Sequence, residues 1–442
     1  MALGGGSWLT QNKVLPGSYI NFASLAKANA TLSDRGVAAA PFILSWGLEG
    51  AVFEVTATDF QKNSKNIFGY DYDAAEMLAL REIFCNATKV YCYRLGTSTK
   101  ASNTFATAKY GGARGNNISI RIEADVNNDG YFIVSTLLDG IAVDEQRAKT
   151  AAELAANDFV VFKTTGVTLS ATAGTPLAGG ADCASITGEH YQAFLDAIES
   201  FSFNTLCCPV NPTDTSSKNT VALFVNFTKR MRGEVGVKFQ LCAIKPEADS
   251  EGVIGIWNTA KFNGVATDVL VYWVTGAQAA VAVNKSLTNS KYNGELIIDT
   301  NYTQAALETA IRTGKFMFHS VDGTVRVLED ISTLVSFTDE KGEIFKNNQT
   351  VRVCDQIAND VAALFNTRYI GNIPNDASGR AALWNDVVSI IRQLEKIRAV
   401  ENFDSDIVHV DLGDDKGSVL LTIDGLNVVN AMSKLYMSVV IQ

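Results

Sequence analysis

The chain has 442 residues, of which 47% are hydrophobic and 19% are charged, and its formal net charge is -10. A chain of this length is expected to form about three domains, and its apolar content is sufficient to fill their cores. The excess of acidic residues argues against nucleic acid as a partner, because phosphate backbones would repel the chain. Its apolar runs are shorter than the roughly 20 residues that cross a bilayer, so membrane insertion is not expected.

The chain begins MALGGGSWLTQNK, which lacks the basic and apolar regions of a secretory signal. We therefore expect the protein to stay in the cytosol of the cell that makes it. Seven cysteines are scattered through the sequence without a CxxC pair, which is typical of reduced thiols in a cytosolic protein. Among them, Cys207 and Cys208 end an apolar run and are expected to pack in the core and to have no redox role.

The N-terminal half predicts a strand, a β-α-β pattern and an insertion. The strand covers 14–22, with Pro16 near its start, as in an edge strand or an arm. The β-α-β pattern comprises an apolar run at 36–44, a helix over 73–86 that Asp71 or Asp73 can cap, and a strand at 89–95. From Gly96 the sequence becomes rich in Thr, Ser, Ala and Gly. Alternating strands at 118–125, 131–139 and 158–163 then predict an all-β insertion that ends near Asp182.

In the second half, helices and strands alternate. Helices over 188–200 and 218–233 precede strands at 205–209 and 237–244, and this spacing predicts α/β layers with a largely parallel sheet. The apolar run at 269–274 has the length of a strand. The C-terminal part predicts a separate α+β unit, with helices over 353–369 and 380–401 and strands at 418–423 and 434–441.

The predicted fold is an α/β core domain with an inserted all-β module, plus a C-terminal α+β domain with extended N- and C-terminal strand arms. Such an insertion costs little, because loop-closure entropy rises slowly with loop length. The expected boundaries are 1–22 for the N-terminal arm, 23–98 and 184–337 for the discontinuous α/β domain, 99–183 for the inserted β domain, and 338–442 for the C-terminal domain, of which 427–442 form the C-terminal arm.

The sequence offers little support for catalysis. The only histidines, His190, His319 and His409, are far apart and stand outside recognisable motifs, so we interpret them as structural. The patterns HExxH, GxSxG and GxxxxGK[ST] do not occur, and we predict neither catalytic residues nor a cofactor. The segment 125–130 imitates the start of a calcium loop, but Thr136 occupies the position of the bidentate Glu. A hairpin turn is therefore favoured over a metal site.

Two further clusters have structural explanations. The glycine-rich segment 111–117 leads into a predicted strand, whereas a phosphate-binding loop leads into a helix, so a turn is expected. The basic segment 229–232 ends a predicted helix, where cations complement the helix dipole. A solvated helix end explains it without RNA or DNA.

Several segments in a fixed order resemble the tail sheath proteins of contractile phages and phage-derived particles. The form most similar is that of Gram-positive phages, defective prophages and R-type bacteriocins. The resemblance extends over most of the chain and rests on the segments 4–8, 13–22, 111–117, 273–277, 284–288, 351–360, 369–372 and 426–436.

This resemblance implies a structural subunit, not an enzyme, that polymerises as stacked hexameric rings around a tail tube. It implies contraction of a metastable sheath, without nucleotide, to drive the tube through a target cell envelope. The implied partners are the tail tube protein and the baseplate and tail terminator proteins. The implied location is a virion tail or phage-tail-like particle assembled in the host bacterial cytoplasm. In such sheaths the C-terminal domain lies innermost, the β module lies outermost, and both chain ends form arms that join the sheets of neighbouring subunits.

The residue pattern supports the arms independently. Segment 434–441 alternates so that one face is wholly apolar, and a strand of this kind can satisfy its backbone by adding to the sheet of a neighbour. Such heterologous contacts generate rings or helical assemblies. The residues predicted at these arm interfaces are Val14, Leu15, Tyr19, Ile20, Phe22, Val419, Leu421, Ile423, Leu435, Met437, Val439 and Ile441.

The long helix over 380–401 also offers a possible tube contact. Its apolar face includes Leu383, Ile391 and Leu394, whereas Arg392 and Lys396 lie on another face and could touch an acidic tube. A solvated helix face explains them equally well. Two other functions stay open: an α/β enzyme that binds a nucleotide or sugar phosphate at the carboxyl ends of its strands, and a non-contractile shell protein that self-associates through the same arms.

Overall fold

The computed structural model describes residues 32–441, so the predicted strand at 14–22 lies outside the described residues. The chain separates into two compact units. The larger unit contains Asp34–Gln356 and the segment that starts at Val428, and the smaller unit contains Ile357–Asn427 and the segment that ends at Ser33. Helix α7 (Asn348–Leu364) contributes its first turns to the larger unit and its remainder to the smaller unit.

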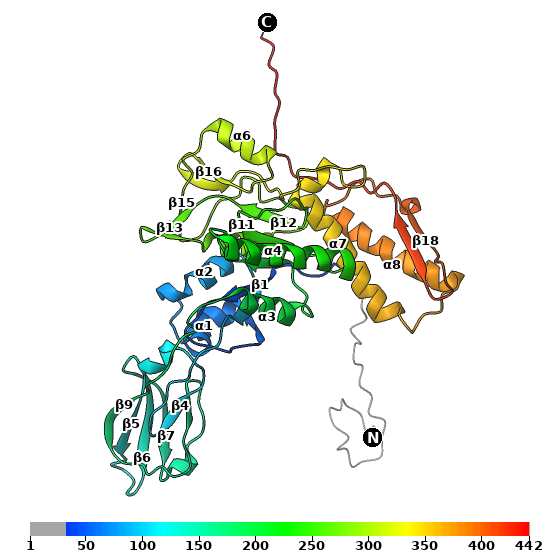
Figure 1. Ribbon diagram of the computed structural model, residues 1–442. Helices are drawn as coiled ribbons and strands as arrows, with labels where there is room; N and C mark the ends of the chain where they lie inside the picture. Colours follow the sequence, from blue (N-terminus) through cyan, green and yellow to red (C-terminus); the bar gives the residue numbers. More distant parts are fainter. Residues whose placement is uncertain (1–31, 442) are drawn as a thin grey trace, which may run out of the picture. The chain divides into compact units, whose positions relative to one another are not determined.

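A six-stranded sheet in the order β12-β11-β10-β1-β3-β2 forms the centre of the larger unit (Figure 1). Five of its strands run parallel, and β2 pairs antiparallel with β3 at one edge. The predicted, largely parallel sheet is therefore confirmed. The strands are β1 (Val37–Phe42), β2 (Val52–Thr56), β3 (Lys89–Arg94), β10 (Thr205–Cys208), β11 (Gln240–Ile244) and β12 (Val253–Ile256).

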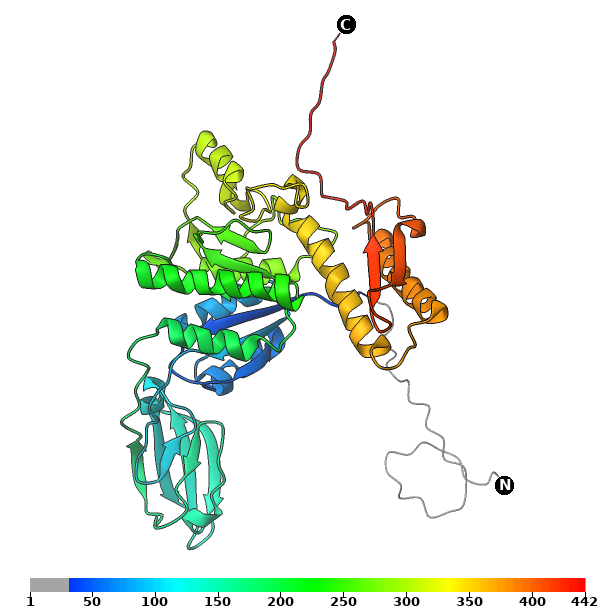
Figure 2. The same ribbon diagram turned by 45° about the vertical axis from the view of Figure 1, so that its right-hand side comes forward.

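Helices cover both faces of this sheet, because its strands are apolar on both sides. Helices α1 (Ala57–Phe68), α2 (Leu78–Phe84) and α5 (Leu270–Ala280) share one core with Cys207. Helices α3 (Gly188–Ile198) and α4 (Thr215–Arg230), the green helices of Figure 2, share the other core with Cys208. Both cysteines are fully buried, so the prediction that they pack in the core is confirmed.

Two local predictions in this unit are wrong. The apolar run at 269–274 is not a strand but forms the N-cap and the first turns of α5, whose residues Leu270–Ala279 are all buried. A helix that is apolar all round has no amphipathic period, so its sequence does not distinguish it from a buried strand. The helix predicted over 73–86 is also shorter, because a 3₁₀ turn at Ala75–Met77 precedes α2. Its N-cap is Met77, and Asp71 instead pairs with Lys65 at 2.9 Å.

The predicted insertion consists of β-strands with a core of their own. Strands β7, β6, β5 and β9 form one sheet in that order, and β4 pairs with β8. Their inward side chains, such as Ile120, Val134 and Phe159, form a separate hydrophobic cluster. The strands are β4 (Ala106–Ala108), β5 (Ile118–Ala124), β6 (Phe132–Leu138), β7 (Ile141–Ala148), β8 (Val160–Phe162) and β9 (Thr172–Pro176).

Both turns predicted in this region are confirmed. Segment 111–117 contains a 3₁₀ turn (Ala113–Asn117) that leads directly into β5. Segment 125–130 connects β5 to β6, and the carboxylate of Asp125 accepts hydrogen bonds from the Asn127 N–H at 2.9 Å and from Arg147 at 2.8 Å. These protein donors occupy the carboxylate that a calcium loop would direct at the metal.

The rest of the larger unit is a group of short elements. They are β13 (Ala260–Phe262), β14 (Val265–Thr267), β15 (Ile297–Ile298), α6 (Gln304–Arg312), β16 (Phe318–Val321) and β17 (Thr324–Val327). None of the helices within residues 32–441 is long and apolar enough to span a membrane.

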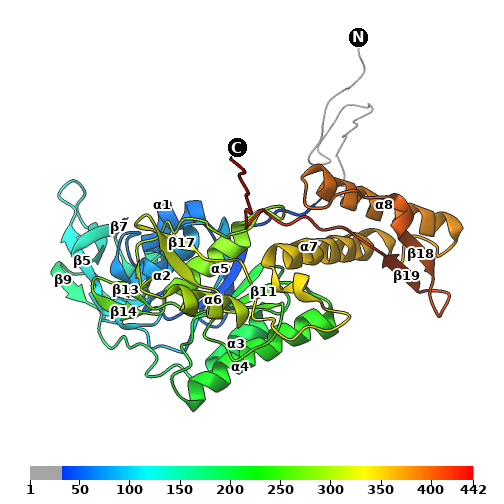
Figure 3. The ribbon, with the colours of Figure 1, turned by 90° about the horizontal axis from the view of Figure 1, so that it is seen from above.

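The smaller unit contains the second part of α7, a π-helical turn (Phe365–Tyr369), α8 (Ala377–Lys396) and a β-hairpin next to α8 (Figure 3). The hairpin consists of β18 (Val408–Leu412) and β19 (Val419–Ile423). Sequence reasoning missed β18, although the alternation in VHVDL was a usable signal. The strand predicted at 434–441 is not formed in this single chain, since a strand requires a partner for its backbone groups.

Candidate assembly site

The outer edges of the β18–β19 hairpin carry backbone groups without a strand partner in residues 32–441. Two hydrogen bonds of 3.0 Å close the ends of the hairpin, from the N–H of Asp424 to the C=O of Ile407 and from the N–H of Gly413 to the C=O of Ser418. In an antiparallel ladder, hydrogen-bonded and non-hydrogen-bonded residue pairs alternate. Every second residue of each strand therefore directs its N–H and C=O away from the other strand. Such an edge is a template for another strand.

The residues with outward backbone groups also share one face of the hairpin, which we call the inner face. It comprises Val408, Val410, Leu412, Val419, Leu421 and Ile423. The inner face lies toward α8, where Val408 is buried and its C=O accepts a hydrogen bond from Trp384 Nε1 at 2.8 Å. The three interface residues predicted in β19 therefore combine an apolar inner face with an open backbone edge.

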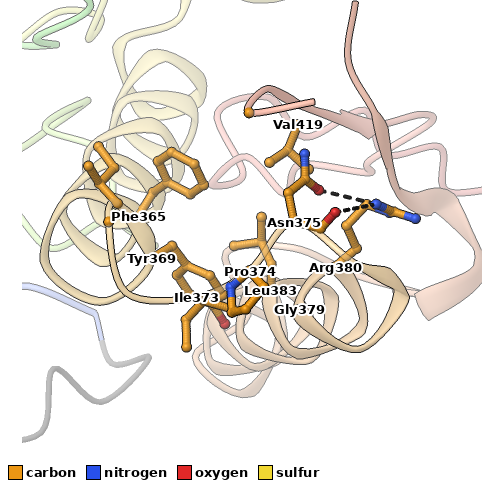
Figure 4. Close-up of a pocket in the computed structure, with 12 residues that line it drawn as sticks. Phe365, Tyr369, Ile373, Pro374, Asn375, Gly379, Arg380, Leu383 and Val419 are labelled. Carbon is orange, nitrogen blue, oxygen red and sulfur yellow. Dashed lines mark hydrogen bonds between the residues drawn. The ribbon is translucent and has the colours of Figure 1, made fainter. Parts of the chain in front are cut away.

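A pocket of about 340 Å³ lies beside the start of β19 (Figure 4). We call it the edge pocket. Its wall is mainly apolar and comes from the π-helical turn after α7, the connection to α8, the start of α8 and the chain around β19. The lining residues are Phe365, Tyr369, Ile370, Gly371, Ile373, Pro374, Asn375, Gly379, Arg380, Leu383, Gly417 and Val419.

Polar contacts fix the wall of the edge pocket. The Tyr369 ring stacks on Phe365 with 6.0 Å between centroids, and its hydroxyl donates to Asp386 at 2.5 Å. Burial, and then this hydrogen bond, raise the pKa of Tyr369, so the hydroxyl stays protonated. On the opposite side, Arg380 donates to the side-chain oxygen of Asn375 at 3.1 Å, as the dashed lines in Figure 4 show. The pocket is therefore preformed.

The predicted C-terminal arm is an extended, exposed segment at the end of the described chain (Figure 1). The exposed fractions of Leu435, Met437, Val439 and Ile441 are 86%, 77%, 70% and 89%. Four such apolar side chains in alternation lack a protein surface to pack on within residues 32–441. The predicted residues of the N-terminal arm, Val14, Leu15, Tyr19, Ile20 and Phe22, lie outside the described residues.

Side chains of α7 contact the start of the predicted C-terminal arm and the first described residues of the chain. On the C-terminal side, the Gln349 amide donates to the C=O of Val429 at 3.1 Å and accepts from the N–H of Ala431 at 2.9 Å. On the N-terminal side, the Ser33 hydroxyl donates to Asp360 at 2.6 Å. Sequence reasoning missed these contacts, because they join residues 80 or more positions apart.

Buried ion pairs anchor the first turns of α7 in the larger unit. Arg352 pairs with Asp330 at 2.8 Å, and both side chains are almost completely buried. Burial alone would raise the pKa of Asp330, but the charge and hydrogen bonds of Arg352 outweigh it and hold this pKa below its ordinary value. Arg232, predicted in a solvated helix end, is instead buried and pairs with Asp355 at 2.6 Å. The basic segment 229–232 predicted the wrong environment for Arg232, because its partner Asp355 lies on α7, far away in the sequence.

The other predicted candidates are dispersed. Arg392 and Lys396 are exposed on α8, away from its buried side chains. The histidines lie in different elements, and His190 is structural, since its Nδ1 accepts the N–H of Thr187 at 3.1 Å and caps α3. His319 is in β16 and His409 is on β18.

The crevice that the alternative enzyme would use lies between β1 and β10, where the strand order reverses. A pocket of about 200 Å³ occupies this place, and the charged side chains in its wall are Glu76 and Asp268. Two carboxylates repel a phosphate group, so this pocket is unsuited to a nucleotide or a sugar phosphate.

Models of four phage tail sheath domains match the chain in succession. The tail sheath protein Gp18 domain III N-terminal region matches 35–95, and the phage tail sheath beta-sandwich domain matches 94–182. The phage tail sheath central domain matches 184–333, and the C-terminal domain matches 340–442.

Full-length proteins show the same similarity. Phage-like element PBSX protein XkdK of Bacillus subtilis is 32% identical, over 99% of each chain. The crystal structure of a sheath tail protein from Desulfitobacterium hafniense is 36% identical, with a TM-score of 0.77 over 92% of this chain and 97% of that one. The helical sheath of the anti-feeding prophage in its contracted state shares the fold at 13% identity, with a TM-score of 0.55 over 97% of this chain and 99% of that one.

Proposed function

Because this chain belongs to the phage tail sheath family and is a structural protein of a contractile tail or tail-like particle, we propose that it polymerises as stacked hexameric rings around a tail tube. Contraction of this sheath drives the tube through the envelope of a target cell. The other partners are the baseplate and tail terminator proteins, and assembly takes place in the host bacterial cytoplasm.

The observation that carries this proposal is the complementarity between two parts of the chain that do not contact each other as strands. The hairpin offers an open backbone edge above an apolar inner face, and the C-terminal arm offers an unpaired backbone with one apolar face. Pairing an arm with the hairpin of another copy satisfies both. Because donor and acceptor surfaces differ, the contact repeats and builds rings or a helix.

The arms also explain how a sheath stays continuous while it contracts. Strand-mediated links act as hinges that hold neighbouring subunits together while the bodies of the subunits rotate and slide. The energy for contraction is stored in interfaces behind a kinetic barrier, so the process needs no nucleotide.

Electron microscopy of the purified protein tests this function. Long hollow tubes or stacked rings are expected. Discrete particles would support the alternative of an α/β enzyme that binds a nucleotide or sugar phosphate, and flat sheets or closed shells would support the surface or shell protein.

Deletion of the arms tests the mechanism of assembly. Removal of residues 1–20 or 427–442 should leave a folded subunit, judged by its circular dichroism and cooperative melting, that no longer polymerises. Tubes that persist after both deletions would refute assembly through the arms.

A further inference from the structure

The pocket of about 200 Å³ between β1 and β10, which we call the crevice pocket, lies where open α/β sheets commonly bind small ligands. Its wall is mainly apolar and includes Phe42 at the end of β1, Leu80 on α2 and Tyr272 on α5. The Tyr272 ring stacks on Phe42 with 5.1 Å between centroids, and its hydroxyl donates to the C=O of Pro41 at 2.8 Å. These two contacts fix the aromatic part of the wall.

Two carboxylates in this wall have no basic partner within residues 32–441. Glu76 and Asp268 are both exposed, and neither forms an ion pair with a described Lys, Arg or His side chain. Asp268 accepts one hydrogen bond, from the side-chain amide of Asn211 at 2.9 Å, and Glu76 accepts none from the described residues. Unbalanced negative charge beside an apolar cavity attracts a cation, because the low dielectric of the wall strengthens the attraction.

A third polar group of the wall is also available to a ligand. Tyr191 of α3 is only 8% exposed, and its ring packs edge-on against Phe224 with 5.8 Å between centroids. Its hydroxyl makes no hydrogen bond to the described residues, although buried polar groups normally have a partner. Burial raises the pKa of Tyr191, so the hydroxyl stays protonated and neutral. Its oxygen can therefore accept a hydrogen bond from a ligand in the pocket.

The lining favours an organic cation over a metal ion. Within the part of the chain that the structure describes, no group of three or more His, Cys, Asp or Glu side chains could hold a metal ion. Apolar walls instead suit an aliphatic chain, and aromatic faces attract ammonium groups. A cavity of about 150 Å³ holds benzene, so the crevice pocket has room for a chain of about four carbons.

We propose that the crevice pocket binds an ammonium group on a short aliphatic chain, with Glu76 and Asp268 balancing its charge and Tyr191 accepting one of its N–H groups. Two sources can present this group: a free aliphatic diamine, and the side chain of a lysine from a second copy of this chain. The site shares no residue with the arms or the hairpin of the proposed function, so the two are tested separately.

Equilibrium dialysis of the full-length chain with radiolabelled 1,4-diaminobutane tests the site. The protein concentration is kept below that at which the chain polymerises, so that a second copy cannot fill the pocket. We expect saturable binding of one molecule per chain. Butane-1,4-diol has the same length without the charges and should compete at least about tenfold more weakly. Absence of saturable binding, or equal competition by the diol, would overturn the inference.

Substitutions at the exposed carboxylates and at the hydroxyl assign the binding to this pocket. Glu76→Gln with Asp268→Asn should weaken binding of 1,4-diaminobutane at least about tenfold, because both charges are lost. Tyr191→Phe should weaken it about fivefold, and the melting temperature without diamine should stay unchanged, because the hydroxyl has no protein partner to lose. Asp129→Asn with Glu145→Gln is the matched control on exposed residues of the inserted module and should have less than a twofold effect. Equal effects of the two double variants would contradict the assignment.

Carbodiimide coupling in the assembled protein distinguishes the two sources, because it joins a carboxylate to an amine in contact with it. Unlabelled and ¹⁵N-labelled chains are mixed before assembly, 1,4-diaminobutane is added, and the products are identified by mass spectrometry. Attachment of the diamine to Glu76 or Asp268 identifies a free amine as the ligand, whereas a crosslink to a lysine of another copy identifies a contact between subunits.

Either product should form at least fivefold more at Glu76 or Asp268 than at the control carboxylates Asp129 and Glu145. Coupling that is no higher than at these controls, or that joins Glu76 and Asp268 only to lysines of the same copy, would overturn the inference. Absence of tubes and rings would instead refute the proposed function, and the dialysis result would still decide whether the crevice pocket binds the diamine.

Discussion

The side-chain amide of Gln349 accepts the N–H of Ala431 at 2.9 Å while it donates to the C=O of Val429 at 3.1 Å. One buried side chain on α7 thus holds three residues of extended backbone at the point where the C-terminal arm begins. At the other end of the described chain, Ser33 contacts Asp360 of the same helix at 2.6 Å. A pull on the C-terminal arm is therefore transmitted to α7.

Loss of the Gln349 contact should loosen the base of the arm without unfolding the subunit. In Gln349→Ala, the backbone groups of Val429 and Ala431 lose their partners but can bind water, so we expect a loss of only about 1 kcal/mol of stability. Hydrogen exchange at the Ala431 amide should accelerate about tenfold, and tube formation should slow. Gln349→Glu keeps the acceptor and removes the donor, so its exchange rate at Ala431 should lie between the two. An unchanged rate in Gln349→Ala would show that the contact does not restrain the arm.

The buried pair between Arg352 and Asp330 should stabilise the larger unit in a pH-dependent way. Besides Arg352, Asp330 accepts hydrogen bonds from Gln278 at 2.6 Å and Asn348 at 2.8 Å. Because its pKa is lower in the folded state than in the unfolded state, its stabilising contribution is complete above the ordinary aspartate pKa of about 4. This contribution is lost as the pH falls through the lower, folded-state pKa.

The corresponding test is chemical denaturation of Asp330→Asn as a function of pH. At neutral pH this variant leaves the Arg352 charge buried without its partner, and we expect a loss of about 3–5 kcal/mol. Its stability should then fall less steeply than that of the wild type on acidification below about pH 4. Asp71→Asn is a suitable control, since Asp71 forms an exposed pair with Lys65 and should change stability by about 1 kcal/mol or less. Parallel pH profiles for wild type and Asp330→Asn would contradict the assignment.

The extent to which the sequence predicted this fold depended on how local each signal was. The parallel sheet was predictable, because amphipathic helices such as α3 and α4 alternate with short apolar strands. Helix α5 was not, because burial on all sides removes the helical period from its sequence. Arg232 was misinterpreted for a related reason: a basic residue at a helix end is usually solvated, and its buried partner Asp355 is 123 positions away.

The apolar C-terminal segment was predictable from the sequence, whereas the edge pocket was not. Alternation in 434–441 identified an apolar face, since strand periodicity is a property of consecutive residues. The edge pocket is lined by Phe365, Leu383 and Val419, which are brought together by the packing of the π-helical turn after α7, of α8 and of β19. Their sequence spacing contains no signal for a pocket.

Arg114 should hold the inserted β module against the α/β core. Its guanidinium binds Asp139 through two hydrogen bonds of 2.9 and 2.5 Å, donates to the C=O of Gly69 at 2.8 Å, and lies 4.4 Å from the centre of the Tyr70 ring. Arg114→Ala removes all these contacts at once. We expect both cores to remain folded, because each has its own hydrophobic cluster.

Limited proteolysis should therefore show cleavage near 96–98 or 182–184 at least fivefold faster in Arg114→Ala than in the wild type. Arg121→Ala is the matched control within the same module, since Arg121 is partly exposed and lies 3.6 Å from Glu123. Unchanged cleavage in Arg114→Ala would mean that other contacts, such as those of Arg94 with the C=O groups of Leu44 and Gly111, suffice to hold the module.

Arg392 and Lys396 are the proposed contacts with the tail tube. Both are exposed on α8 one helical turn apart, so they present two positive charges on one side of the helix. If this side faces an acidic tube, Arg392→Glu with Lys396→Glu should reduce the number of tubes decorated with sheath at least tenfold in electron micrographs. Higher salt should also weaken decoration by the wild type, because salt screens such contacts.

Lys100→Glu with Lys149→Glu is the matched control. It changes the net charge equally on exposed residues of the inserted module and should leave decoration intact. Normal decoration by the α8 variant would remove these residues from the tube interface and indicate that they form a solvated helix face.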